Sequence, residues 1–477
     1  MDEASSDAAA KAAPVRAVAV SWVAPSVLGE GQRGERLKLS FLDSLWVVLP
    51  PIQRVFLYQL GEDDGFQFQA VVERLKRALA DTLAHYLPLA GTLEYEVETG
   101  DAFVDCTNAG VAFHEAEGDM DVRRLAGDEA HDILAFLSLV PELDARVLPA
   151  PVLSVQATRL SAGLSVGLSV HHAVADGRAV WRFMEAWSSA SREGSPVTKV
   201  LGPPHSNTHY SRDVIHHANA DELAREMLKT VGPNLPEVRG QHDFSQRFLL
   251  ARRTFYLGTD DIQSLRRRID DLASAEAAAA GGDAPKLKQV STFVALAALS
   301  WTAFVRSKRL GAGDGTYLVF LADLRSRLDP HVSEAYLGNC VRACLASCAD
   351  AADLLGQAGI LRAARAVQAA VAEMEAAPLS GTDKGWMQKL MRLPFQRLTN
   401  VAASPRFRAY EAADFGFGKP ARVELVSMNH DGEMVLVGGR RDGEVQASVS
   451  IDPAHMDAFK ACIGRSGGTP LPCKMPV

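Results

Sequence analysis

The length of the chain constrains its fold more than any other feature of the sequence. A single hydrophobic core stops growing at roughly 250–300 residues, and this chain has 477 residues. We therefore expect two domains of similar size. The composition, with 47% hydrophobic and 23% charged residues, is that of an ordinary globular protein. Strand-like and helix-like periodicities are mixed along the sequence, which predicts the α/β class.

Changes of pattern along the chain suggest where the domains begin and end. Residues 1–15 are rich in alanine and are expected to form a disordered tail. Residues 16–200 are predicted to be the N-terminal domain and residues 247–477 the C-terminal domain. Residues 201–246 are rich in Pro, His, Asn and Ser, so we expect a crossover linker there, with a helix at 220–231.

Periodicity predicts several individual elements. Apolar residues recur at helical spacing in 72–86 and again in 180–187. The apolar segments 152–160 and 164–170 are predicted to be two strands joined by a short turn. The low-complexity segment 274–285, SAEAAAAGGDAP, is predicted to be a flexible surface loop.

Charge and hydropathy exclude some classes of protein. The net charge is -8, which argues against a general nucleic-acid binder. The N-terminal residues include three acids and lack the basic start and apolar stretch of a signal peptide. The longest apolar stretch, residues 290–305, is shorter than the ~20 residues that a membrane span needs. We therefore expect a cytoplasmic protein with no membrane partner.

Three of the six cysteines, Cys340, Cys344 and Cys348, recur at every fourth residue. No Cys-x-x-Cys pair or histidine cluster accompanies them, and small apolar residues fill the gaps. We interpret them as buried thiols that behave like small hydrophobic residues, and we predict no metal site.

The motif with the most chemical content is HHAVADG, residues 171–177. It follows the predicted strand 164–170 and precedes a predicted helix, so it should form a turn at a sheet edge. The ordinary pKa of a histidine, about 6.5, suits His172 to take up and return a proton near neutrality. Asp176 is interpreted as a structural brace of the loop. The alternative is a structural turn in which Asp176 bonds its own backbone while the histidines pack.

A competing motif, Gly-x-Ser-x-Gly, lies shortly before HHAVADG, at residues 163–167. It carries the nucleophile of hydrolases when it forms a sharp turn from strand to helix. Ser165 instead lies in a run of alternating apolar residues, and no helix is predicted before Asp176. We therefore do not interpret Ser165 as a nucleophile. The glycine-rich segment 311–315 lacks the lysine of a P-loop and is predicted to be a loop.

Several segments together resemble the plant BAHD acyltransferases, a family of coenzyme A-dependent acyltransferases. HHAVADG fits the family motif His-x-x-x-Asp-Gly. Residues 414–420, DFGFGKP, fit its second signature, except that Phe417 replaces a tryptophan. Further segments match in the expected order: YLPLAG at 86–91, ADLRSRLDP at 322–330 and YLGNC at 336–340. The resemblance covers nearly the whole chain.

The resemblance implies a fold and a mechanism. The fold would be two similar-sized α/β domains with mixed sheets, of the coenzyme A-dependent acyltransferase type, with a channel between them that contains His172. His172 would remove a proton from the acceptor as the acceptor attacks the thioester of an acyl-coenzyme A, with no permanently bound cofactor. Asp176 would pair with Arg325 or Arg327. Structural roles are implied for Asn339, Asp414, Gly416, Phe417 and Gly418.

Coenzyme A is polyanionic, so its binding needs local cations and amides. The resemblance suggests candidates before the apolar segment 293–305 and before the DFGFG signature. These candidates are Lys286, Lys288, Ser291, Thr292, Ser404 and Arg406. Ser291 at a helix start would place free backbone N–H groups near phosphate. For each lysine or arginine, the alternative is a solvated surface charge.

The segments YLGNC and 39–60 look most like the branch of the family that acts on flavonoid, anthocyanin and phenolic glucosides. We therefore predict that malonyl moves from malonyl-CoA to a sugar hydroxyl of such a small molecule, by an enzyme that is a monomer. A malonyl donor needs a cation for its free carboxylate. Arg178 is the candidate, and the alternative for it is an outward-facing helix residue.

Other functions stay open at this point. A hydroxycinnamoyl-CoA-dependent member of the same family is one alternative. A condensation domain of a peptide synthetase shares the HHxxxDG pattern, but it should lack DFGFG. A homologue that binds ligand without catalysis is a third.

Overall fold

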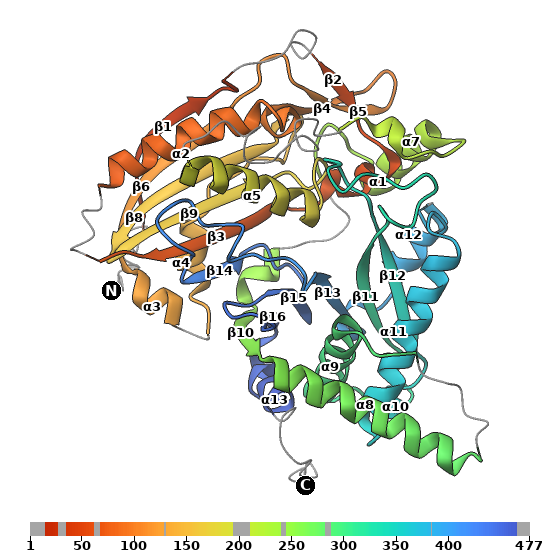
Figure 1. Ribbon diagram of the computed structural model, residues 1–477. Coiled ribbons are helices and arrows are strands. Elements are labelled where there is room, and N and C mark those ends of the chain that lie inside the picture. The colour runs from red at the N-terminus through yellow and green to blue at the C-terminus, as the bar shows by residue number, and fades with distance from the viewer. Residues whose placement is uncertain are drawn as a thin grey trace, which may run out of the picture.

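The computed structural model describes residues 15–26, 35–61, 67–127, 130–193, 210–239, 245–281, 288–382 and 384–464. Most of the expected tail, parts of the crossover linker, Lys286 and Cys473 lie outside these residues. Within the described ranges the strands form three sheets (Figure 1).

The first sheet comes mainly from the N-terminal half. Its strands, in spatial order, are β1 (Arg16–Val23), β6 (Val111–Asp121), β8 (Leu153–Ser161), β9 (Gly163–Val170), β3 (Ile52–Gln59) and β14 (Arg422–Leu425). β6 and β8 run parallel, whereas the other neighbours are antiparallel. The two strands predicted at 152–160 and 164–170 are β8 and β9.

β14 departs from the predicted division of the chain. It lies within the segment 247–477, yet it pairs with β3, where Val423 is opposite Phe56. Its neighbours in sequence, β13 (Leu398–Ala403) and β15 (Glu433–Gly438), belong to the second sheet. The predicted N-terminal domain, residues 16–200, does not contain this strand, because the chain crosses back to complete that sheet.

The second sheet comes entirely from the C-terminal half. Its strands, in spatial order, are β10 (Ala251–Leu257), β16 (Val445–Ile451), β15, β13, β11 (Thr316–Asp323) and β12 (Val341–Cys348). It is also mixed, since β13 runs parallel to both β11 and β15. A small third sheet contains β2 (Arg36–Lys38), β5 (Asp101–Asp105), β4 (Thr92–Glu96) and β7 (Ala150–Pro151).

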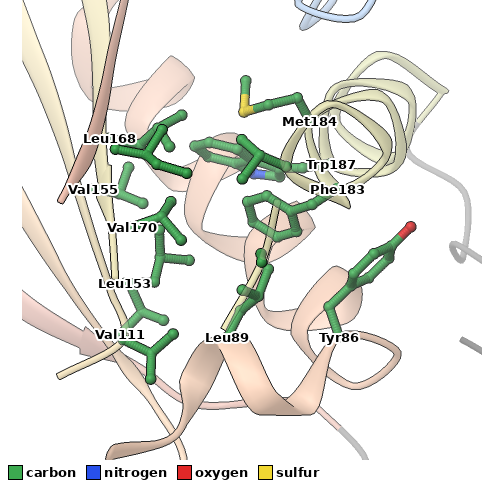
Figure 2. Packing of buried hydrophobic residues seen from close by; sticks show 14 of the residues in the cluster. Tyr86, Leu89, Val111, Leu153, Val155, Leu168, Val170, Phe183, Met184 and Trp187 are labelled. Atoms are coloured by element: carbon green, nitrogen blue, oxygen red, sulfur yellow. The ribbon is translucent and has the colours of Figure 1, made fainter. Parts of the chain in front are cut away.

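Two helices, α2 (Phe68–Leu83) and α5 (Gly177–Glu193), lie side by side on one face of the first sheet (Figure 1). The apolar stripe predicted in 72–86 is buried along the inner face of α2 and the turn that follows it. Figure 2 shows Phe183, Met184 and Trp187 of α5 directed toward Val155 and Leu168 of the sheet. Burying each large apolar side chain contributes roughly 1.5–3 kcal/mol, so this layer holds α5 firmly on β9.

Helices of the C-terminal half include α8 (Thr259–Ala279), α9 (Thr292–Ser307), α11 (Gly359–Ala376) and α13 (Pro453–Ile463). α9 is buried on nearly all sides and packs against α11 and α13. α8 extends to Ala279, so the prediction of a flexible loop from residue 274 is wrong for 274–279. Alanine is the best helix former, and the alanine run continues the helix until the glycines that follow.

The remaining helices are short or connect the two halves. They are α1 (Phe41–Ser44), α3 (Val122–Gly127), α4 (Ile133–Ser138), α7 (Ala220–Val231), α10 (Ala352–Leu355) and α12 (Lys384–Met391). The 3-10 helices are η1 (Leu45–Val48), η3 (Leu87–Ala90), η5 (Arg212–Val214), η6 (Ser245–Leu249) and η7 (Phe395–Arg397). α7 confirms the helix predicted at 220–231.

Cys340 and Cys344 are buried within the core of the C-terminal half, and Cys348 is half-buried at the end of β12. Burial raises the pKa of the Cys340 thiol to about 12 and that of Cys344 to about 11. Both are protonated, small apolar side chains in this setting. In the described part of the chain, no cluster of side chains has the composition of a metal site, and no helix is long and apolar enough to span a membrane.

Candidate active site

His172 lies in the turn that connects the C-terminal end of β9, an interior strand of the first sheet, to α5. The two adjacent histidines point into different surroundings: His171 is 1% exposed and packs inward, whereas His172 is only partly buried. The backbone N–H of His171 donates to the carbonyl of Val152, which joins the turn to the start of the neighbouring strand β8. Ser165 lies inside β9 and is fully buried, so the Gly-x-Ser-x-Gly motif is a strand and not a nucleophile turn.

The imidazole of His172 is stacked on the indole of Trp46 from η1. The ring centroids are 4.1 Å apart and the planes are inclined by 9°. Burial lowers the pKa of His172 to about 4, its own carbonyl opposes the shift, and the charge of Arg54 lowers the pKa further. The ring is therefore neutral at physiological pH, which is the form that can accept a proton.

Asp176 pairs with Arg325. The guanidinium donates from Nη1 to Oδ2 at 2.9 Å and from Nη2 to Oδ1 at 3.2 Å. The same carboxylate accepts the backbone N–H of Ala179, in the first turn of α5, and that of Cys340 before β12. Both side chains are almost completely buried. Of the two arginines left open by the sequence, Arg327 is exposed and donates to the carbonyl of Asp323 instead.

Asn339 joins the turn to a second buried carboxylate. Its side-chain amide donates to the carbonyl oxygen of His172 at 2.9 Å and to Asp43 Oδ1 at 3.0 Å. Asp43 also accepts from Nε of Arg212 at 2.8 Å. Arg212 in turn donates to the carbonyls of Leu337 and Val174. The backbone of His172 is thus held by segments from the N-terminal half, the crossover and the C-terminal half.

The DFGFG segment packs against the helices of the N-terminal half rather than beside His172. Phe415 contacts the indole of Trp187, with ring centroids 4.7 Å apart. Phe417 contacts Tyr58 at 4.6 Å and lies under the guanidinium of Arg74. The backbone carbonyl of Asp414 accepts from Arg192, while its carboxylate accepts the N–H of Gly416. Gly416 and Gly418 both have positive φ angles, +94° and +92°, that favour glycine.

The coenzyme A candidates fall into two groups in the structure. Ser291 is the N-cap of α9 and accepts the N–H of Val294, with Thr292 beside it and Lys288 exposed just before it. Ser404 accepts the N–H of the exposed Arg406 in the turn after β13. No hydrogen bond or ion pair within the described ranges joins the two groups. Their role, like the channel expected between the halves, remains a prediction.

Arg178 is already engaged by two carboxylates. Its Nε donates to Asp323 at 2.7 Å and its Nη1 donates to Glu334. A guanidinium that is paired on both sides has little remaining charge to offer a substrate carboxylate. This pairing argues against the interpretation of Arg178 as the partner of an acyl carboxylate.

No sequence motif identifies four further residues of this region: Asp43, Trp46, Arg54 and Arg212. They lie far from HHAVADG in sequence and form no contiguous motif with it. Two local signals existed. Ser40 and Asp43 form a capping box at the start of α1, and Arg54 is a buried charged residue in the mostly apolar strand β3.

Comparison with known proteins identifies the family. A family model described as "Transferase family" matches residues 20–463. Phenolic glucoside malonyltransferase 2 of Arabidopsis thaliana is 28% identical over 434 residues, covering 89% of this chain and 92% of the relative. An Arabidopsis malonyl-CoA:anthocyanidin 5-O-glucoside-6''-O-malonyltransferase is 30% identical over 451 residues, covering 89% and 92%.

The fold also matches solved structures. Vinorine synthase superposes with a TM-score of 0.66 at 20% sequence identity, covering 93% of this chain and 96% of that structure. The match of the family model over nearly the whole chain and the fold likeness agree with each other. The chain therefore belongs to the Transferase family, whose members are the BAHD acyltransferases, and it is an acyltransferase.

Proposed function

We propose that this acyltransferase moves malonyl from malonyl-CoA onto a sugar hydroxyl of a flavonoid, anthocyanin or phenolic glucoside, with His172 as the general base. The observation that carries the proposal is the setting of His172. Its ring is neutral and stacked on Trp46, its carbonyl is held by Asn339, and Asp176 is committed to Arg325.

We propose that one of the two ring nitrogens of His172 contacts the substrate. Nδ1 of His172 is buried and has no side-chain or backbone partner in the described part of the chain, whereas Nε2 is not among the buried unpaired atoms. We assign proton transfer to Nε2. It takes the proton of the acceptor hydroxyl as that oxygen forms a bond to the thioester carbon.

The rest of the reaction balances without a covalent acyl-enzyme. The carbon–sulfur bond breaks as the tetrahedral intermediate collapses, and the proton held by His172 passes to the departing thiolate of coenzyme A. Donor and acceptor must then be bound together, so the kinetics should show a ternary complex rather than a ping-pong pattern.

The oxyanion of the intermediate needs a hydrogen-bond donor. Nε1 of Trp46 is buried and has no partner within the described ranges, and its ring lies against His172. A buried N–H without a partner is costly in the free protein, and an oxyanion would satisfy it. We therefore assign this donor role to Trp46.

The donor and acceptor are proposed from the names of the relatives together with the YLGNC and 39–60 segments. The two Arabidopsis relatives are named for malonyl transfer to phenolic glucosides and anthocyanidin glucosides. For coenzyme A itself, we propose contacts from Lys288, Ser291, Thr292, Ser404 and Arg406, and from Lys286 outside the described residues. A hydroxycinnamoyl-CoA donor and a non-catalytic binding role are the competing proposals.

The test is an assay for release of free coenzyme A thiol. Malonyl-CoA and, separately, p-coumaroyl-CoA are paired with a panel of flavonoid and phenolic glucosides. Wild type is compared with His172→Ala and with His114→Ala, which removes a half-buried histidine from β6 of the same sheet. Calorimetric titration with coenzyme A checks that both variants still bind it.

We expect acceptor-dependent release by wild type and by His114→Ala, and a loss of roughly 10²–10⁴-fold in kcat in His172→Ala. Release that survives in His172→Ala would overturn the assignment of the base. Preference for p-coumaroyl-CoA would replace the donor, and the absence of turnover with every pair would favour the binding role.

A further inference from the structure

A second arginine in the site region is buried without a carboxylate beside it. Arg54 lies on β3, between Leu168 of β9 and Leu425 of β14, and its exposed fraction is 8%. Its Nη1 donates to the carbonyl of Gln53 at 2.9 Å, and its Nε is buried with no partner. In the described part of the chain, no carboxylate lies within ion-pair distance of Arg54.

A buried guanidinium without an ion-pair partner lowers the stability of the folded protein. Arginine is effectively always charged, and an unpaired buried charge destabilises the folded state. Burial lowers the pKa of Arg54 to about 9, which still leaves it protonated at neutral pH. The cost is offset if an anion from outside the chain binds there.

Arg54 also lies close enough to His172 to act on it. Ile52, two residues before Arg54 on the same strand, pairs with Val170, which directly precedes the two histidines. The positive charge of Arg54 contributes to the lowered pKa of His172. An anion bound to Arg54 would therefore lie near the base.

The surrounding charges do not neutralise Arg54. Glu433 of β15 interacts with it from beyond ion-pair distance. That carboxylate already accepts the backbone N–H groups of Asn429 and His430, and its burial raises its pKa. Arg252 interacts with the same glutamate and donates to the carbonyls of Val426 and Met428. Arg252 also interacts with Arg247 and Glu424, and Glu424 is ion-paired with Arg422. The arginines of this group therefore outnumber its two glutamates.

We infer that Arg54 binds the free carboxylate of the acyl donor, and that the enzyme therefore selects coenzyme A thioesters of short dicarboxylic acids over neutral acyl groups. The inference rests on the proposed function, because it places the thioester beside His172. In a malonyl thioester, one methylene separates the free carboxylate from the reacting carbonyl. The group that binds it must therefore lie beside the base, which fits Arg54, whereas Arg178 is already paired with two carboxylates.

The experiment compares malonyl-CoA with acetyl-CoA, which has the same thioester and no carboxylate, using one acceptor. The variants are Arg54→Gln, Arg54→Lys and Arg54→Met, with Arg178→Gln as the matched control. The readout is the ratio of kcat/KM for malonyl-CoA to kcat/KM for acetyl-CoA. Thermal shifts with each coenzyme A thioester, measured without acceptor, report binding independently of turnover.

We expect Arg54→Gln to lower the malonyl-to-acetyl ratio by about 10- to 100-fold, the range of one charge-assisted hydrogen-bonded contact. Arg54→Lys should recover part of the ratio, because it keeps the charge and loses the fork of donors. Arg178→Gln should leave the ratio unchanged. Arg54→Met should melt no lower than wild type without ligand, since it removes an unpaired buried charge, and it should lose the extra stabilisation by malonyl-CoA over acetyl-CoA.

Three results would overturn the inference. One is an equal loss for both donors in Arg54→Gln together with a lower melting temperature of Arg54→Met, which would mean a structural role. Another is an unchanged ratio in an active Arg54→Gln. The third is turnover of p-coumaroyl-CoA but not of malonyl-CoA by wild type. That result would contradict the inference about Arg54 without contradicting the proposal that His172 is the base. A wild type inactive with every donor would overturn the proposed function as well.

Discussion

The carboxylate of Asp176 and the guanidinium of Arg325 are joined by two hydrogen bonds, of 2.9 and 3.2 Å, inside the protein. Asp176 is 1% exposed and Arg325 is 0% exposed. Arg325 follows β11 and Asp176 precedes α5, so the pair joins the turn that contains His172 to the C-terminal end of β11 in the second sheet. The arrangement supports our proposal that Asp176 holds the loop and that His172 transfers the proton.

Removing one partner of this pair should cost much more than removing both. Asp176→Ala leaves Arg325 buried and unpaired, and we expect the free energy of unfolding to fall by about 3–5 kcal/mol. The double variant Asp176→Leu with Arg325→Met should recover a large part of that loss, as measured by urea denaturation. A cost below about 1 kcal/mol for Asp176→Ala would contradict the structural role.

Substitutions at Trp46 should separate stacking from hydrogen bonding. Trp46→Phe keeps an aromatic ring against His172 and removes the N–H, so kcat should fall by about 10²–10³-fold if that N–H stabilises the oxyanion. Trp46→Leu removes both contributions and should lower kcat further, with coenzyme A affinity unchanged in both variants. Full activity of Trp46→Phe in steady-state assays would exclude the donor role.

The pH profile of kcat/KM should reflect the lowered pKa of His172, about 4. The reaction needs the neutral imidazole, so the rate falls as the pH drops through that pKa. We expect kcat/KM to stay level from about pH 8 to about pH 6 and to decline only near pH 4–5. Circular dichroism at each pH serves as the control for folding. A half-maximal rate near pH 6.5 would mean that His172 titrates like an exposed histidine.

His131, at the junction of the two halves, should make the fold sensitive to acid. Burial lowers its pKa to about 4, although Glu424 opposes the shift and Arg422 lowers the pKa further. The unfolded chain, with a histidine pKa of about 6.5, binds more protons below that pH, so stability falls as the pH drops from about 6.5 toward 4.

The measurement is urea denaturation of wild type and His131→Gln at two pH values. Relative to wild type, the variant should gain about 2 kcal/mol between pH 7.5 and pH 5. If the free energies of unfolding of the two proteins changed in parallel with pH, the pKa of His131 would be the same in the native and unfolded states.

Prediction from sequence succeeded where local pattern determines structure. The stripe through Val72, Leu75 and Leu79 predicted α2, because helical spacing places those side chains on one face. HHAVADG located the turn because its residues are contiguous. The family and the fold class followed from such contiguous segments and are confirmed.

Residues that are brought together only by tertiary contacts could not be predicted from the sequence. Asp43 and Arg212 form their ion pair between an N-terminal turn and the crossover, and no local pattern links them. Arg54 lies in a strand whose pattern predicts burial, but only the three-dimensional arrangement shows that no carboxylate of the described chain accompanies it. The alanine-rich residues 275–279 continue α8, because their helix propensity determines the structure there in spite of the low complexity of the segment.

The pairing of β14 with β3 has a consequence for how the protein is made. β3 is synthesised long before β14. The edge of the first sheet at β3 therefore stays unpaired while most of the second half is synthesised. An open strand edge is a template for pairing with other chains. A truncated product ending before residue 422 would keep that edge permanently, and we expect it to aggregate rather than to survive as a separate domain.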